Sequence, residues 1–121
     1  MSELTTRLVL WTNPSCSKSN ATEELVAELG VPVAPRRYLS EPPSRQELEE
    51  VLRKLGTDDP RAITRTGEPA YAGLEEAGRD ELLDALATHP ELIERPIAIL
   101  GDRAVVCRPP ERLRELLDAP A

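Results

Sequence analysis

A cysteine stands where a short apolar run ends and a helix-forming stretch begins. Cys16 lies within the segment Asn13-Pro14-Ser15-Cys16-Ser17-Lys18-Ser19. At the start of a helix, backbone N–H groups without a partner and the positive end of the helix dipole favour a thiolate and can cradle an oxyanion. Lys18 adds a nearby cation, and Ser17 and Ser19 add hydroxyls. The pattern predicts a cysteine nucleophile that acts on an anion, and a buried structural cysteine is the alternative.

Cys16 is not part of a Cys-x-x-Cys pair, because Ser19 occupies the position of the second cysteine. An enzyme with one nucleophilic cysteine must pass its adduct to an outside thiol, such as glutathione. The other cysteine, Cys107, ends an apolar run, and we expect it in the core rather than as a resolving thiol. Two cysteines so far apart are no disulfide framework, and they indicate a cytoplasmic protein whose thiols stay reduced.

Three arginines, Arg65, Arg95 and Arg108, lie at junctions between expected elements rather than on helix faces. Guanidinium groups bind tetrahedral oxyanions through forked hydrogen bonds, and three of them could neutralise a dianion. Spacing alone leaves an ordinary surface or salt-bridged role equally open for each. The sequence has no His and Cys spacing typical of a metal site, so we expect no bound metal.

The elements that must position these residues form two halves. Residues 7–39 predict a buried strand, a helix that begins after Cys16 and ends at Gly30, and an edge strand. Residues 97–100 and 104–107 predict a hairpin, and a last helix follows it. A βαβ unit followed by a ββα unit is typical of an α/β fold, a thioredoxin-like sandwich around a mixed four-stranded sheet.

Between the halves we expect a helical insertion over about residues 44–91, where Ser44 and Glu47 form a capping box. We expect a single domain over residues 1–121, with an aliphatic core because the chain has no Phe. The formal net charge of -7 disfavours nucleic acid and anionic membranes as partners. No apolar run reaches the length of a transmembrane helix, and Met1–Thr6 is unlike a signal peptide.

The chain resembles the glutaredoxin-linked arsenate reductases of the ArsC family over nearly its whole length. The matching segments are residues 13–19, Tyr38-Leu39, residues 42–48, Arg65 with Glu68 and Tyr71, residues 89–97 and residues 107–109. Each segment is a weak signal alone. All of them in this order, at compatible spacing, are specific.

The resemblance implies a thioredoxin-like fold with Cys16 as the nucleophile. It implies an oxyanion site that comprises Arg65, Arg95, Arg108, Ser17, Lys18 and Ser19, with Asn13 and a cis Pro96 as structural residues beside it. It also implies arsenate as the substrate, glutathione as the co-substrate and glutaredoxin as the partner, with no bound cofactor. We expect a monomer.

Two positions depart from the family pattern. Many members carry Arg directly after the Cys-x-x-Ser segment and His four residues before the cysteine, where this chain has Asn20 and Thr12. A thiol oxidoreductase on the same scaffold with another substrate, such as a glutathione mixed disulfide, therefore stays open. A regulator of the Spx type that binds RNA polymerase is a further alternative, although such proteins usually carry Cys-x-x-Cys.

Overall fold

The computed structural model describes residues 8–13 and 15–118, so the predictions made for Met1–Thr6 and Pro14 lie outside the described residues. The chain forms two compact units. The first combines Met1–Arg37 with Arg95–Ala121, and the second is Tyr38–Glu94.

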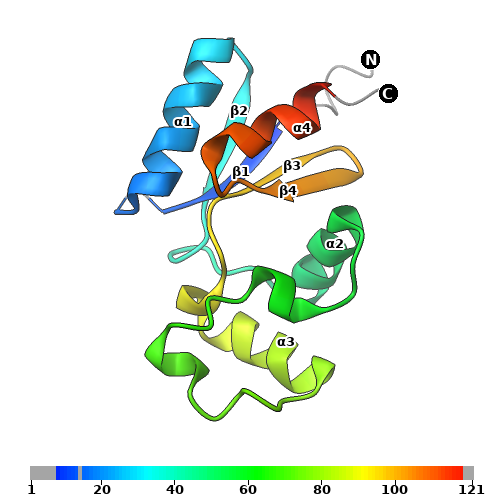
Figure 1. Ribbon diagram of the computed structural model, residues 1–121. Helices are drawn as coiled ribbons and strands as arrows, with labels where there is room; N and C mark the ends of the chain where they lie inside the picture. Colours follow the sequence, from blue (N-terminus) through cyan, green and yellow to red (C-terminus); the bar gives the residue numbers. More distant parts are fainter. Residues whose placement is uncertain (1–7, 14, 119–121) are drawn as a thin grey trace. The chain divides into compact units, whose positions relative to one another are not determined.

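A mixed four-stranded sheet organises the first unit (Figure 1). Its strands, in the spatial order β2-β1-β3-β4, are β2 (Val33–Arg37), β1 (Leu8–Thr12), β3 (Ile97–Leu100) and β4 (Arg103–Val106). Strand β1 pairs parallel with β2 and antiparallel with β3, and β3 pairs antiparallel with β4. The predicted thioredoxin-like α/β fold is confirmed.

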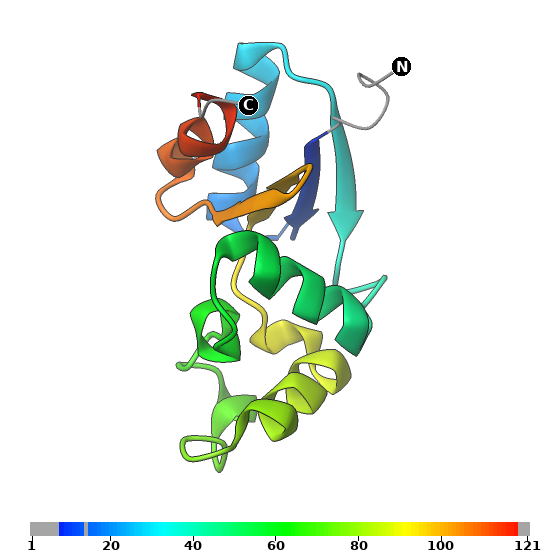
Figure 2. The same cartoon turned by 90° about the vertical axis from the view of Figure 1, so that its right-hand side faces the viewer.

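Two helices, α1 (Ser17–Leu29) and α4 (Leu113–Asp118), cover the same face of this sheet (Figures 1 and 2). The core between these helices and the sheet is aliphatic, as expected from a chain without Phe. Its buried members are Leu8, Leu10, Val26, Ala98, Val105, Cys107, Leu113 and Leu116.

Local signals place the ends of these elements. Helix α1 ends at Gly30, which has φ 70°, a conformation that costs glycine little because it has no Cβ. Strand β2 lies at the edge of the sheet, where Pro35 can be accommodated without the N–H donor that an inner strand needs. The hairpin is shifted from our expectation, since β4 begins at Arg103 and ends at Val106.

The second unit consists of helices and short turns. Helices α2 (Arg45–Leu55) and α3 (Arg79–Thr88) pack against each other. Three 3-10 turns, η2 (Pro60–Ile63), η3 (Pro69–Tyr71) and η4 (Pro90–Leu92), complete the unit. The predicted helical insertion is therefore present.

Polar contacts link the parts of the second unit. The predicted capping box forms at the start of α2, where Ser44 Oγ accepts from the Glu47 N–H and the Glu47 carboxylate accepts from the Ser44 N–H. Arg45 of α2 pairs with Asp80 and Asp84 of α3. No helix in the described residues is long and apolar enough to span a membrane.

Candidate active site

Cys16 lies at the N-cap of α1, as the sequence predicts. The Cys16 N–H donates to the Asn13 carbonyl at 2.9 Å, and the Cys16 carbonyl accepts from the Asn20 N–H at 3.0 Å, which is the first bond of the helix. The first turn of α1 contains no acidic residue, so the positive end of the helix dipole is not neutralised there. The setting is the one that favours a thiolate.

The cysteine is more buried than its polar neighbours in sequence led us to expect. Cys16 is 7% exposed, whereas Ser15 and Ser17 on either side of it are exposed. Neither Cys16 nor Cys107 forms a disulfide. Cys16 therefore combines a small accessible surface with a position at a helix start.

Asn13 organises the turn that carries the cysteine. Its side-chain Oδ1 accepts from the Ser15 N–H at 3.0 Å, and its carbonyl accepts from the Cys16 N–H. Its own N–H donates to Ser19 Oγ at 3.1 Å. Asn13 thus bonds both to the turn and to helix α1.

Two of the three predicted arginines lie at the same end of the sheet as the cysteine turn. Ile97 pairs with Trp11 at the end of β1, and Val106 pairs with Ile97. Arg95 lies two residues before the start of β3, and Arg108 lies two residues after the end of β4. The Arg108 Nη1 donates to the Arg95 carbonyl at 3.1 Å, so the two residues are adjacent.

The peptide bond between Arg95 and Pro96 is cis, which confirms the prediction for Pro96. The bond between Arg108 and Pro109 is also cis, which the sequence analysis did not anticipate. The Pro96 carbonyl accepts from the Cys107 N–H at 2.9 Å. This bond continues the β3–β4 pairing up to the two arginines.

Arg65, the third predicted arginine, belongs to the second unit. Its Nη1 lies 2.8 Å from Glu68 Oε2, and its backbone N–H donates to the Leu92 carbonyl at 2.7 Å. Residue Thr64 beside it bridges to Ile93. The segment around Arg65 is therefore held by backbone hydrogen bonds, while the guanidinium pairs with a carboxylate.

The three predicted ligands on α1 differ in accessibility. Ser17 is exposed at the first position of the helix, and the side chain of Lys18 lies outside the described part of the chain. Ser19 is fully buried, and its Oγ accepts from the Asn13 N–H. Binding of an oxyanion by the backbone N–H groups of the first turn needs no exposure of the Ser19 side chain.

Cys107 lies in the core, as predicted. It is 0% exposed and packs with the aliphatic residues of the sheet, α1 and α4. Burial raises the pKa of the Cys107 thiol from an ordinary value of 9.0 to about 12, a rise that the positive charge of Arg112 partly opposes. The two cysteines thus occupy opposite environments.

This raised pKa predicts a loss of stability at high pH. The pKa of the Cys107 thiol is 9.0 in the unfolded chain and about 12 in the folded one. The neutral thiol therefore stabilises the folded state fully below pH 9.0, and this stabilisation is lost as the pH rises towards 12. By pH 11 the wild type should lose roughly 3 kcal/mol of unfolding free energy that a Cys107→Ala variant does not lose. Urea unfolding of both proteins between pH 8 and pH 11 measures the difference, and parallel curves would contradict the prediction.

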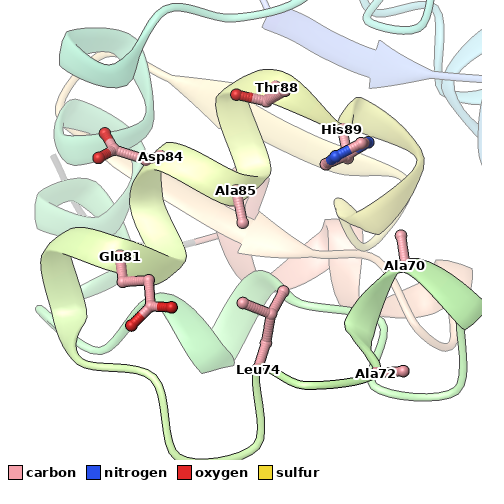
Figure 3. A pocket seen from close by; sticks show the side chains of 8 residues that line it. All are labelled: Ala70, Ala72, Leu74, Glu81, Asp84, Ala85, Thr88 and His89. Carbon is pink, nitrogen blue, oxygen red and sulfur yellow. The ribbon is translucent and has the colours of Figure 1, made fainter.

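A hollow of about 310 Å³ lies within the second unit, between α3 and the segment around Leu74 (Figure 3). Its polar lining includes Asp84 and His89. Asp84 pairs with Arg45, and His89 Nδ1 lies 3.5 Å from the Glu91 carboxylate. The lining contains no cysteine, and it coincides with none of the predicted site residues. Among the described residues, no group of three or more His, Cys, Asp or Glu is arranged to hold a metal ion.

Two polar arrangements were missed by the sequence analysis. Arg61 donates to the carbonyls of Leu74, Glu75 and Ala77, so it holds a loop of the second unit. Thr12 Oγ1 donates to Glu23 Oε2 at 2.6 Å, which joins the end of β1 to α1. Both pairings join residues more than ten positions apart, and no local pattern in the sequence indicates them.

Known proteins are similar to this chain over most of its length. The arsenate reductase of Haemophilus influenzae is 39% identical and covers 91% of this chain and 98% of its own length. A protein of the glnII region of Streptomyces viridochromogenes is 40% identical and covers 89% and 97%. The solved structure of the arsenate reductase from Vibrio cholerae has a TM-score of 0.86 at 36% identity, and covers 92% of this chain and 98% of that one.

A sequence model of the ArsC family matches residues 11–116. The match includes the cysteine turn, both arginines at the end of the sheet, and Arg65. It agrees with the observed fold and with the structural similarity to the protein from Vibrio cholerae. The chain belongs to the ArsC family.

Proposed function

We propose that this protein is an arsenate reductase that uses Cys16 as its one nucleophile and takes electrons from glutathione and glutaredoxin. The observation that carries the proposal is the pairing of a cysteine at the start of α1 with two adjacent arginines, Arg95 and Arg108, at the same end of the sheet. The names of the relatives from Haemophilus influenzae and Vibrio cholerae agree with it.

In the first step the Cys16 thiolate attacks the arsenic of H₂AsO₄⁻. A sulfur–arsenic bond forms, one oxygen takes up a proton and leaves as water, and the adduct keeps arsenic in the +5 state. Arg95 and Arg108 offset the negative charge on the arsenate oxygens. The backbone N–H groups at the start of α1 also stabilise this negative charge. Fixed donors of this kind stabilise charge that develops during the reaction.

In the second step two external thiols supply the electrons. The glutathione thiol adds to arsenic and displaces a second oxygen as water. The glutaredoxin thiolate then attacks the glutathione sulfur, so that a mixed disulfide forms and an electron pair stays on arsenic. Water releases arsenite from Cys16. Overall, H₂AsO₄⁻, two thiols and one proton give H₃AsO₃, one disulfide and water. The reaction needs a reduced Cys16, which fits a cytoplasmic protein.

A coupled assay tests the proposal. The purified protein is mixed with glutathione, glutaredoxin, glutathione reductase and NADPH, and absorbance at the NADPH band is followed after arsenate is added. We expect NADPH consumption that requires arsenate. Phosphate has the same shape and charge but is not reduced, so it should compete with arsenate and support no turnover.

The same assay distinguishes arsenate reduction from the main alternative, a thiol oxidoreductase with another substrate. Glutathione mixed disulfides can be supplied in place of arsenate, and turnover with these alone would favour a thiol oxidoreductase with another substrate. No arsenate-dependent consumption by protein with a free Cys16 thiol would disprove the proposal.

A further inference from the structure

The end of strand β1 is joined to helix α1 by a partly buried side-chain hydrogen bond. Thr12 is the last residue of β1 and is 1% exposed. Its hydroxyl donates to the Glu23 carboxylate at 2.6 Å, and Glu23 lies in α1 and is half-buried. A hydroxyl-to-carboxylate bond is short and strong because the acceptor is charged.

A second contact runs beside the first. The Asn13 N–H donates to Ser19 Oγ at 3.1 Å, and Ser19 is fully buried. Ser19 and Glu23 are four residues apart in α1, so they lie on the same face of the helix. Two consecutive residues at the end of the strand are thus joined to one face of α1.

The turn that carries the cysteine begins at these two residues and ends at the helix. The Asn13 carbonyl accepts from the Cys16 N–H, so a shift of Thr12 and Asn13 moves Cys16 as well. Cys16 is the N-cap residue of α1. Its position at the helix start is therefore linked, through Asn13, to the contacts that hold the strand end against α1.

We infer that the hydrogen bond between Thr12 and Glu23 is a positioning contact that keeps Cys16 at the start of α1, and so keeps its thiol reactive. The inference deepens the proposed function, and rests on it for the part that concerns arsenate. Thr12 and Glu23 are positioning residues, since they act through the turn and not on the substrate.

Simple electrostatics predicts a different result for Glu23. Its negative charge lies on the Cys16 side of the helix, seven residues further on and about 10 Å along the axis. By charge alone it opposes a thiolate, so removal of the charge would make Cys16 more reactive. The positioning contact predicts that removal of the Thr12 hydroxyl, which leaves the charge in place, makes Cys16 less reactive.

The test is the pH dependence of Cys16 alkylation by iodoacetamide, with the modified residue identified by mass spectrometry. Thr12→Val should raise the midpoint pH and lower the rate below the midpoint by about two- to fivefold, the range of one charge interacting with a helix terminus. Thr12→Ser keeps the hydroxyl and should restore the wild-type profile. A folded Thr12→Val variant with the wild-type profile would overturn the inference.

Thr64→Val is the matched control. Thr64 is 7% exposed, and its Oγ1 donates to the Pro60 carbonyl at 2.8 Å in the second unit. Its loss also removes a hydrogen bond of a buried threonine hydroxyl, here one to a neutral carbonyl and outside the cysteine turn. We expect a lower melting temperature and an unchanged alkylation profile. A shift equal to that of Thr12→Val would also overturn the inference, because the effect would then follow stability alone.

Variants of Glu23 provide a second route if Thr12→Val does not fold. Glu23→Gln keeps an acceptor for the Thr12 hydroxyl and should leave the midpoint at or below that of the wild type, whereas Glu23→Leu should raise it. The double variant Thr12→Val with Glu23→Leu should shift the midpoint no further than either single variant, because both remove one contact. A Glu23→Leu midpoint no higher than that of Glu23→Gln would count against the contact.

The readout also separates this inference from the proposed function. Wild-type protein that does not reduce arsenate, with a Thr12→Val variant that still shifts the alkylation midpoint, would disprove the arsenate reaction and leave the positioning contact supported. Arsenate turnover by the wild type with no shift in Thr12→Val would do the reverse.

Discussion

Replacement of Cys16 by serine should abolish arsenate-dependent NADPH consumption, with a loss of at least about 10³-fold in turnover. A serine hydroxyl keeps its proton at neutral pH, and the thiolate is the form of cysteine that acts as a nucleophile. The change is small in volume, and Cys16 lies at a helix N-cap, a position that serine occupies readily. We therefore expect the fold to persist, which circular dichroism and thermal unfolding can check.

Cys107→Ala is the matched control for this loss. Cys107 is fully buried, and its thiol has a pKa of about 12, so it is neutral in the folded protein near pH 7. We expect turnover within about twofold of the wild type, because substitutions outside the reacting groups act mainly on stability. If activity survived Cys16→Ser but not Cys107→Ala, the nucleophile would be Cys107 and not Cys16, and the proposed mechanism would be overturned.

Alkylation offers an independent check on the same pair. Cys16 should react with iodoacetamide near neutral pH, with a midpoint below the roughly 8.5 of an unperturbed cysteine. Arsenate should slow this reaction if it occupies the start of α1. Cys107 should not react in the folded protein.

The parts of the fold that the sequence predicted correctly depend on local signals. Gly30 marks the end of α1 because a left-handed residue is needed there, and Ser44 with Glu47 marks the start of α2 because each caps the other. The two short apolar runs of the hairpin are separated by a turn, and that pattern is also local. Such signals need no knowledge of distant partners.

Errors occurred where boundaries or contacts depend on the rest of the chain. The last helix was expected to follow the hairpin, but a 3-10 turn, Pro110–Arg112, comes first and α4 begins at Leu113. The burial of Cys16 was also underestimated, because a run of polar neighbours says little about how a turn packs. Pairing between Thr12 and Glu23 is a tertiary contact, and a threonine followed by a glutamate eleven residues later has no recognisable pattern.

The residues of the candidate site could be predicted from the sequence, but the contacts between them could not. The cysteine and the arginines could be named from the sequence, since each lies at a junction between elements, whereas the cis Pro96 was implied by the resemblance to the ArsC family. That Arg108 contacts the backbone of Arg95 could not, because it depends on the register of β3 and β4. The same register brings Arg108 to the end of the sheet at which the cysteine turn lies.

Replacement of Arg108 by alanine should lower kcat/KM for arsenate by about 10²-fold, which corresponds to about 2.7 kcal/mol of transition-state stabilisation. One guanidinium N–H of Arg108 donates to the Arg95 carbonyl, so the substitution removes a cation and a contact that orients its neighbour. Arg108→Lys keeps the charge but not the forked geometry that fits a tetrahedral oxyanion. We expect it to be intermediate, at about tenfold below the wild type.

Arg112→Ala is the control, because Arg112 is an exposed arginine four residues further along the chain that pairs with Glu115. Both substitutions are at exposed side chains and should change the unfolding free energy by less than about 0.5 kcal/mol. Arsenate kinetics at fixed glutathione measure the effect, and the KM for glutathione should not move in either variant. If Arg108→Ala weakened turnover no more than Arg112→Ala, the charge of Arg108 would not act on the substrate. The anion would then have to be bound by Arg95 and the helix start without Arg108, since backbone N–H groups can also hold an oxyanion.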